Sequence, residues 1–292
     1  MRRLGTGLFL FGSGLYKARA ARHSTVPPSL RIRDRPRARP TLLYEGNERN
    51  LAMVALSVIV PVKDEAENAA PLAREIAAAI AGESSAEIIF VDDGSSDSTA
   101  AELKALTGEM PHLRIIQHGR NIGQSRAIRT GVRAAKGDII VTLDGDGQND
   151  PHDIPKLLEV LRNGEHQHIG MVSGVRKQRK DNFSKRFASG FANGFRQWML
   201  NDHASDSGCG LKAFKRDLFL ALPFFDNMHR FLIALTWREG YQVHFVEVNH
   251  RPREHGKSKY NNTKRAIMGL IDTVGVRWLQ RRFKGAVETK EI

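Results

Sequence analysis

The chain has 292 residues, 41% of them hydrophobic, which is enough for a single large α/β domain with additional segments. Its formal charge is +13, but residues 1–52 carry eleven Lys or Arg against three acidic residues and so hold +8 of it, which leaves little support for a nucleic-acid partner. The single cysteine, Cys209, excludes an internal disulfide, and no apolar run has the roughly 18 residues that would span a bilayer, so we expect no transmembrane helix.

Residues 1–52 differ from the rest of the chain. Segment 31–40 alternates Arg with Pro, and the apolar stretch 8–11 is short. Three interpretations stay open: a targeting segment, a disordered basic tail, or translated upstream sequence with the true start at Met53. We expect a basic extension over 1–52, a main domain over 53–250, and a cationic loop followed by an amphipathic helix over 251–292.

Strands and helices are predicted to alternate from Leu56 onward. Thr99, with Glu102 three residues later, predicts a capping box at the start of the second helix. Asp150 and Pro151 predict the start of the fourth helix, which ends at Gly164. The predicted strands are 56–60, 87–91, 113–117 and 138–143, and the first helix carries Leu72, Ile76 and Ile80 on one face.

Acidic residues follow three of these strands. Repeated strand and helix units with short turns predict a parallel sheet with helices on both faces, and right-handed crossovers place the strand ends at one edge. Open sheets of this kind bind ligands at that edge. We therefore expect four carboxylates to converge there: Glu65, Asp93, Asp144 and Asp146.

The motif Asp144-Gly-Asp146 suggests a metal site. Two carboxylates one residue apart at a strand end can hold Mg²⁺ or Mn²⁺ and leave positions for diphosphate oxygens. Gln148 can add a neutral oxygen. Alone the motif is weak, because acidic turns are common on surfaces, but the two other acidic strand ends strengthen it.

The second half of the chain is less regular. We expect strands over 170–175 and 241–248 and a basic loop over 176–180. Two apolar stripes each allow two interpretations, packing in the core or contact with lipid. The first stripe is Phe187, Phe191, Phe195 and Trp198, and the second is Ile267, Leu270, Ile271, Val274 and Trp278, flanked by Lys and Arg.

Seven segments together resemble family 2 glycosyltransferases with the GT-A fold. The downstream segments resemble the polyprenol-phosphate branch, whose members are similar to dolichol-phosphate mannose synthase. The motifs occur in the family's order and cover about residues 55–283. The segments are 56–67, 87–99, 121–123 and 143–155 in the donor half, and 172–176, 206–212 and 253–259 downstream.

The resemblance implies roles for particular positions. Asp93 matches the contact to the nucleotide base, and Pro61 and Glu65 match the loop beneath the nucleoside. Asp144 and Asp146 match the metal and diphosphate motif, with Gln148 in the metal shell. The positions matching cations for the acceptor phosphate or donor diphosphate are Arg176, Lys212 and Arg253, and Ser258 and Lys259 belong to the last loop.

Three features depart from the family pattern. Lys63-Asp64 stands where many members have Tyr-Asn, which leaves the donor open. Asp144-Gly-Asp-Gly replaces the commoner Asp-Ala-Asp-Leu, and the usual C-terminal transmembrane helices are missing.

The resemblance implies an inverting, metal-dependent transfer of a sugar from a nucleotide-diphosphate sugar to a polyprenyl phosphate, either dolichyl or undecaprenyl. Asp144, Asp146 and Arg253 would carry the chemistry. A lipid phosphate is anionic at neutral pH, so it needs cations more than a general base. The expected location is the cytoplasmic face of a membrane, as a peripheral protein, with a small transmembrane partner protein left open.

Other functions stay open. A family 2 transferase acting on a polysaccharide or glycolipid hydroxyl would need a base, for which Asp206 is the nearest candidate; holding its own loop is an equal alternative for that residue. A nucleotidyltransferase would also use paired carboxylates. A non-enzymatic basic protein that binds membrane or RNA is the remaining class.

Overall fold

The computed structural model describes residues 55–164, 167–176, 194–204, 206–253 and 262–285, with the backbone alone for 262–267. The predicted extension 1–52 lies outside these residues. So do the loop positions 177–180 and four residues singled out above: Phe187, Phe191, Ser258 and Lys259.

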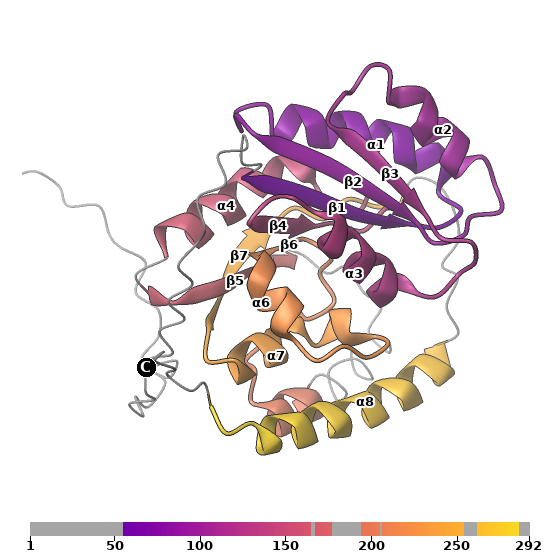
Figure 1. Ribbon diagram of the computed structural model, residues 1–292. Helices are drawn as coiled ribbons and strands as arrows, with labels where there is room; N and C mark the ends of the chain where they lie inside the picture. Colours follow the sequence, from indigo (N-terminus) through magenta and orange to yellow (C-terminus); the bar gives the residue numbers. More distant parts are fainter. Residues whose placement is uncertain (1–54, 165–166, 177–193, 205, 254–261, 286–292) are drawn as a thin grey trace, which may run out of the picture. The chain divides into compact units, whose positions relative to one another are not determined.

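The first half alternates strands and helices, as predicted (Figure 1). Strand β1 is buried at all seven positions because helices cover both faces of the sheet. The spacing of residues after the third strand predicts a helix from 121 to 135, but α3 begins at Gln124, since Gly123 before it has a φ of 96° and is not helical. The elements are β1 (Leu56–Val62), α1 (Ala66–Ala79), β2 (Ala86–Asp92), α2 (Thr99–Leu106), β3 (Leu113–Gln117), α3 (Gln124–Ala134) and β4 (Ile139–Thr142).

The second half adds three strands and several helices. Asp150 caps a short 3₁₀ turn by accepting a hydrogen bond from the His152 N–H over 3.1 Å, and this turn leads into α4, so the predicted helix start is confirmed. The elements are η2 (Pro151–Asp153), α4 (Ile154–Asn163), β5 (Ile169–Arg176), helix 194–200, β6 (Lys212–Lys215), α6 (Arg216–Ala221), η4 (Met228–Arg230), α7 (Leu232–Arg238), β7 (Gln242–Val248) and α8 (Asn262–Arg282).

The seven strands form one sheet in the order β3-β2-β1-β4-β6-β5-β7. Strand β6 runs antiparallel to both of its neighbours, β4 and β5, and the other neighbouring strands pair in parallel. The predicted doubly wound, mostly parallel sheet is therefore confirmed. The one antiparallel strand is β6. It follows β5 in the chain and lies between β4 and β5 in the sheet.

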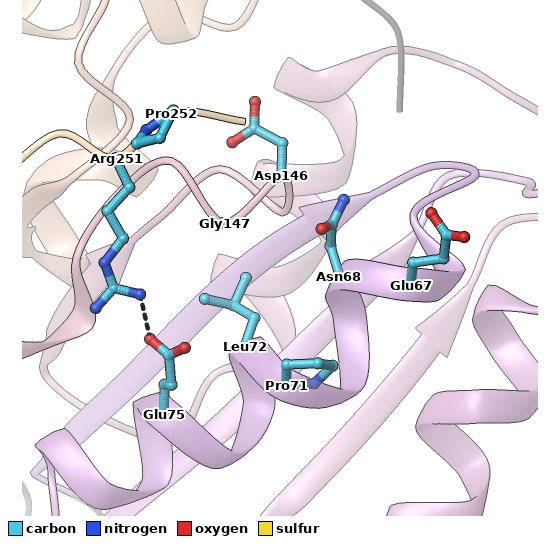
Figure 2. A pocket seen from close by; sticks show the side chains of 9 residues that line it. All are labelled: Glu67, Asn68, Pro71, Leu72, Glu75, Asp146, Gly147, Arg251 and Pro252. Atoms are coloured by element: carbon cyan, nitrogen blue, oxygen red, sulfur yellow. Dashed lines mark hydrogen bonds and ion pairs between the residues drawn. The ribbon is translucent and has the colours of Figure 1, made fainter. Parts of the chain in front are cut away.

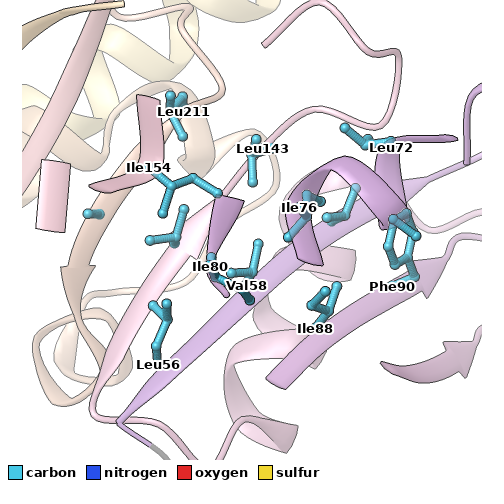
Figure 3. Close-up of a cluster of buried hydrophobic side chains, with 14 of the residues drawn as sticks. Leu56, Val58, Leu72, Ile76, Ile80, Ile88, Phe90, Leu143, Ile154 and Leu211 are labelled. Carbon is cyan, nitrogen blue, oxygen red and sulfur yellow. The ribbon is translucent and has the colours of Figure 1, made fainter. Parts of the chain in front are cut away.

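The core has one apolar cluster on each face of the sheet, because successive side chains of a strand point to opposite faces. Val58 and Val60 join the cluster with α1, α2 and α4, which Figure 3 shows in part. Ile59 points the other way, to the cluster with α3, α6 and α7. The packing holds β1 inside the sheet, between β2 and β4, and the loop after β1 lies at the edge where the parallel strands end.

The predicted capping box at Thr99 is wrong. Thr99 is already the first residue of α2, and Ser98 before it makes no side-chain capping bond. The Thr99 hydroxyl donates to Asp97 over 2.5 Å and accepts from the Glu65 N–H over 2.9 Å. Tertiary contact with the loop after β1 thus replaces the local cap.

Candidate active site

The ends of β1, β2 and β4 meet at one edge of the sheet. The Asp93 N–H donates to the Val62 carbonyl over 2.8 Å, which joins the ends of β1 and β2. A Cβ at Gly145 would lie 2.9 Å from the Pro61 carbonyl oxygen, so glycine is needed for the acidic motif to lie against β1. The acidic motif and the loops after β1 and β2 lie side by side, as the topology predicts.

Asp144 is half-buried beside the start of α3. The Gln124 side-chain amide donates to its Oδ1 over 2.8 Å, and its own N–H donates to the Asn149 side chain over 3.0 Å. A Cβ at Gly210 would overlap its carboxylate. Burial raises the pKa of Asp144, and the nearby negative charge of Asp146 raises it further.

Asp146 has a bonding partner on each carboxylate oxygen. Its Oδ1 accepts from the Gln148 N–H over 3.2 Å, and its Oδ2 accepts from the guanidinium of Arg253. Both side chains of the ion pair are partly buried. A predicted metal ligand and a predicted phosphate-binding cation are therefore in direct contact.

Arg251 fixes the chain that carries Arg253. Its N–H donates to the Gln148 carbonyl over 2.9 Å. Its guanidinium donates to Glu75 of α1 over 2.6 Å and to Asp150 over 2.7 Å. The segment after β7 is thus bound to both the acidic loop and α1.

A small pocket of about 100 Å³ lies between α1 and the acidic loop. Figure 2 shows Asn68, Leu72 and Glu75 of α1 on one side and Asp146 and Pro252 on the other. The pocket therefore borders the acidic motif at the edge where such sheets bind ligands. Its lining is Glu67, Asn68, Pro71, Leu72, Glu75, Asp146, Gly147, Arg251 and Pro252.

Asp93 holds the loop that precedes α3. Its carboxylate accepts from the Ile122 N–H over 2.9 Å and the Gly123 N–H over 2.8 Å, and His118 Nδ1 lies 2.8 Å from Oδ1. Asp93 is only 4% exposed. These bonds give it a structural role, and its contact with a nucleotide base stays a prediction.

The loops after β1 and β2 are bonded to each other. The Lys63 ammonium donates to the Gly94 carbonyl over 3.0 Å, and the Ser96 N–H donates to Asp64 over 2.7 Å. The Ser96 bond is the main cause that lowers the pKa of Asp64 to about 2. Asp64 has a φ of 46°, a conformation that Asp and Asn tolerate. Lys63-Asp64 thus stabilises this edge despite departing from the family pattern.

Pro61 and Glu65 flank the same loop. Pro61 is a buried residue of β1. The Glu65 carboxylate accepts from the Asn68 side chain over 2.7 Å at the start of α1. Their predicted place beneath a nucleoside stays a prediction.

Arg176 forms a bidentate ion pair with Asp206. Its Nε and Nη2 donate to the two carboxylate oxygens over 2.6 and 2.7 Å, and the hydrogen bond to Asp206 raises the pKa of Arg176. Lys212 is 4% exposed, donates to the Cys209 carbonyl, and has its pKa lowered by burial. These contacts give both cations structural partners, and their binding of a substrate phosphate stays a prediction.

The side chains around Asp144 and Asp146 fit a hard divalent cation. Two carboxylates and the amide oxygen of Gln148 are ligands that Mg²⁺ and Mn²⁺ prefer. Among the residues that the structure describes, no group of three or more His, Cys, Asp or Glu side chains is arranged to hold a metal. Substrate oxygens would complete the shell, and Arg253 would have to leave Oδ2 of Asp146.

Helix α8 packs on the domain by one side and exposes several large apolar residues on the other. Thr273 and Val276 are buried, and the Gln280 side chain donates to the Leu200 carbonyl over 3.1 Å. Trp198, on the neighbouring helix 194–200, is 78% exposed. No helix in the described parts of the chain is long and apolar enough to span a bilayer. What we term the apolar face of α8 consists of Leu270, Ile271, Val274 and Trp278, which are 51–59% exposed.

Sequence reasoning missed three residues that organise this site: Gln124, Asn149 and Arg251. Gln124 directly follows segment 121–123, which is part of the family resemblance. That neighbouring position was the only feature of the sequence that could have pointed to Gln124. Asn149 and Arg251 lie in stretches that were recognised, but their partners become visible only when the loops meet.

Residues 57–222 match a family model described as glycosyl transferase family 2. A dodecaprenyl-phosphate galacturonate synthase from Rhizobium johnstonii is 34% identical over 238 residues, which cover 78% of this chain and 69% of that protein. An undecaprenyl-phosphate 4-deoxy-4-formamido-L-arabinose transferase from Edwardsiella ictaluri is 35% identical over 212 residues, covering 72% of this chain and 64% of that relative. The chain thus spans less than two thirds of the second relative's length.

Solved structures of glucosyl-3-phosphoglycerate synthase from Mycobacterium tuberculosis share the fold. The complex with Mn²⁺, UDP-glucose and phosphoglyceric acid has a TM-score of 0.62 at 20% identity, covering 76% of this chain and 80% of that one. The complex with Mg²⁺ and UDP has a TM-score of 0.61.

Proposed function

Since the chain belongs to glycosyl transferase family 2 and has the GT-A fold of a glycosyltransferase, we propose that it transfers a sugar from a nucleotide-diphosphate sugar to a polyprenyl phosphate. The relatives named for dodecaprenyl and undecaprenyl phosphate support this acceptor. The observation that supports the proposal is the ion pair between Arg253 and Asp146, because an arginine suited to binding a phosphate lies against a carboxylate proposed as a metal ligand.

The proposed chemistry is a direct displacement. An oxygen of the lipid phosphate attacks the anomeric carbon, and the bond from that carbon to the diphosphate breaks with inversion. A divalent cation held by Asp144, Asp146 and Gln148 would stabilise the charge of the leaving diphosphate. Arg253 would position the attacking phosphate, as charge-assisted hydrogen bonds from arginine do.

A general base is not needed for this acceptor. The second pKa of a phosphate monoester is about 6, so the attacking oxygen is already ionised at neutral pH. A hydroxyl acceptor would need a carboxylate base, but both oxygens of the candidate Asp206 are bonded to Arg176. This pair favours a loop-holding role for Asp206 and the phosphate acceptor over the hydroxyl.

A membrane surface is the proposed location of the reaction. The apolar face of α8 is exposed, Arg281 and Arg282 follow it, and Arg282 lies over the Trp278 ring at 5.9 Å. Apolar residues with Trp and flanking arginines are typical of helices that lie in the headgroup region of anionic bilayers. Docking by this face would keep the protein where its lipid substrate lies.

The experiment is a donor and acceptor screen. The protein, in vesicles containing polyprenyl phosphate and Mn²⁺, is incubated with labelled UDP-, GDP- and dTDP-sugars, and the lipid is extracted. We expect one donor to label the lipid and Asp146→Asn to abolish the labelling. If no donor labels the lipid, even in membranes from the native host, the proposed acceptor is wrong.

A further inference from the structure

Arg253 and Asp146 form an ion pair with each other. The guanidinium donates to Oδ2 of Asp146, while Oδ1 is bonded to the Gln148 N–H. Under the proposed function the two residues have different partners, a metal ion for Asp146 and the acceptor phosphate for Arg253. The observed pair is therefore incompatible with the occupied site on both sides.

The conflict is electrostatic as well as steric. A guanidinium and a divalent cation on the same carboxylate would place three positive charges within a few ångströms, in a partly buried site where screening is weak. One of them has to leave. The cation also has Asp144 and the donor diphosphate to bind, so Arg253 is the group that is displaced.

The surroundings allow Arg253 to move by itself. Arg251, two residues earlier, is bonded to Glu75, to Asp150 and through its N–H to Gln148, so the backbone that precedes Arg253 is fixed. The only bond recorded for the Arg253 side chain among the described residues is the one to Asp146. A rotation of this side chain can therefore break the pair without disturbing the acidic loop.

We propose that Arg253 is an exchange switch that couples the two substrates. Before the donor binds, Arg253 takes the position of the cation on Asp146. When the metal ion and the nucleotide diphosphate bind, the guanidinium is released and becomes available to the acceptor phosphate. Donor binding thus precedes acceptor binding and strengthens it. The exchange makes and breaks ion pairs alone, and its acceptor step rests on the proposed function.

The first test measures the metal side without sugar or lipid. Mn²⁺ binding in the presence of UDP is followed by the electron paramagnetic resonance signal of free Mn²⁺. Because Arg253→Ala removes the competing cation, we expect it to bind Mn²⁺ about fivefold or more tightly than the unaltered protein, within the range of known coupling energies. Arg253→Lys, which keeps the charge, should bind Mn²⁺ less tightly than Arg253→Ala.

Arg162→Ala is the matched control. Arg162 also donates to a carboxylate, with two bonds of 2.8 and 2.7 Å to Glu83, and its removal changes the net charge equally. We expect its Mn²⁺ affinity to be unchanged, which separates local competition from a general charge effect. If Arg253→Ala binds Mn²⁺ no more tightly than the unaltered protein, the switch is refuted, even where lipid labelling succeeds.

The second test measures the acceptor side. Binding of citronellyl phosphate, a short polyprenyl phosphate, is measured by calorimetry with and without Mn²⁺ and UDP. The unaltered protein should bind it at least about fivefold more tightly when both are present. Arg253→Ala should bind it weakly in both conditions. Equal affinity of the unaltered protein in the two conditions would overturn the coupling.

Discussion

The Gln124 side chain donates a hydrogen bond of 2.8 Å to Asp144, which joins the first residue of α3 to the acidic motif after β4. The loop before Gln124 is itself held by Asp93 at the end of β2. The ends of two strands, β2 and β4, therefore act together on the orientation of the Asp144 carboxylate. The bond also stabilises the ionised form of Asp144 against the effect of its burial.

Gln124→Ala should lower kcat/KM about tenfold, the equivalent of one hydrogen bond to a charged group. The unfolding free energy should change little, because the loss is confined to the orientation of Asp144. Steady-state kinetics with the donor identified in the screen would measure the effect. Gln242→Ala, at an exposed position of β7, is the control and should be silent. A Gln124→Ala enzyme with unchanged kinetics would contradict the assigned role.

Gly210→Ala should impair both stability and activity. The added Cβ would overlap the Asp144 carboxylate, so we expect a loss of about 1–3 kcal/mol in unfolding free energy and weaker Mn²⁺ binding. Gly82→Ala adds the same methyl group where no atom lies within 4 Å and should be neutral or slightly stabilising. Urea denaturation of both variants tests the difference, and similar values for the two would refute the close packing at Gly210.

We expect Glu87 to make the free energy of unfolding depend on pH in the acidic range. It is 5% exposed and accepts from Ser57 over 2.7 Å, from the Lys136 N–H over 2.6 Å and from Arg114 over 2.5 Å. Burial alone would raise the pKa of Glu87, but these three bonds outweigh it and lower the pKa below the usual 4.5. Its contribution to stability is therefore full above pH 4.5 and is lost as the pH falls through the lowered pKa.

Glu87→Gln should reduce the unfolding free energy by about 2–3 kcal/mol at pH 7, as expected for a buried carboxylate with charged partners. The difference from the unaltered protein should shrink as the pH falls below 4.5, because both proteins then carry a neutral side chain there. Urea denaturation at several pH values measures it. Glu102→Gln, at an exposed position, should stay within about 0.5 kcal/mol. A difference that is independent of pH would disagree with the lowered pKa.

Ile271→Glu should weaken binding to anionic vesicles about tenfold, since a charge replaces one side chain of the apolar face of α8. Vesicle sedimentation measures the effect, and binding of the unaltered protein should decrease with added salt because arginines flank the face. Leu220→Glu places the same charge on an exposed leucine of α6 and is the matched control. Equal losses for both variants would mean that α8 does not contact the membrane.

The sequence alone determined the fold class, the family and the residues at the ligand-binding edge. This was possible because a parallel sheet has its own signature: buried runs such as β1, with polar motifs directly after them, dictate which residues share an edge. The acidic motif at Asp144 and Asp146 could be placed there before any contact was known. The apolar stripe of α8 could be recognised from the sequence. The sequence did not show whether the rest of the domain covers that stripe.

Only the tertiary structure decided which partners these residues have. The hydroxyl of Thr99 does not cap α2, because Thr99 already lies inside the helix; it donates to Asp97 and accepts from the Glu65 N–H in the loop after β1. Two further contacts also join loops that are distant in the sequence. Gln124 contacts Asp144, and Arg253 contacts Asp146, which lies 107 positions earlier in the chain. Hydrogen bonds and ion pairs act over a few ångströms, so they form only where loops from different strands come close together. The distance between two loops in space cannot be read from their spacing along the chain.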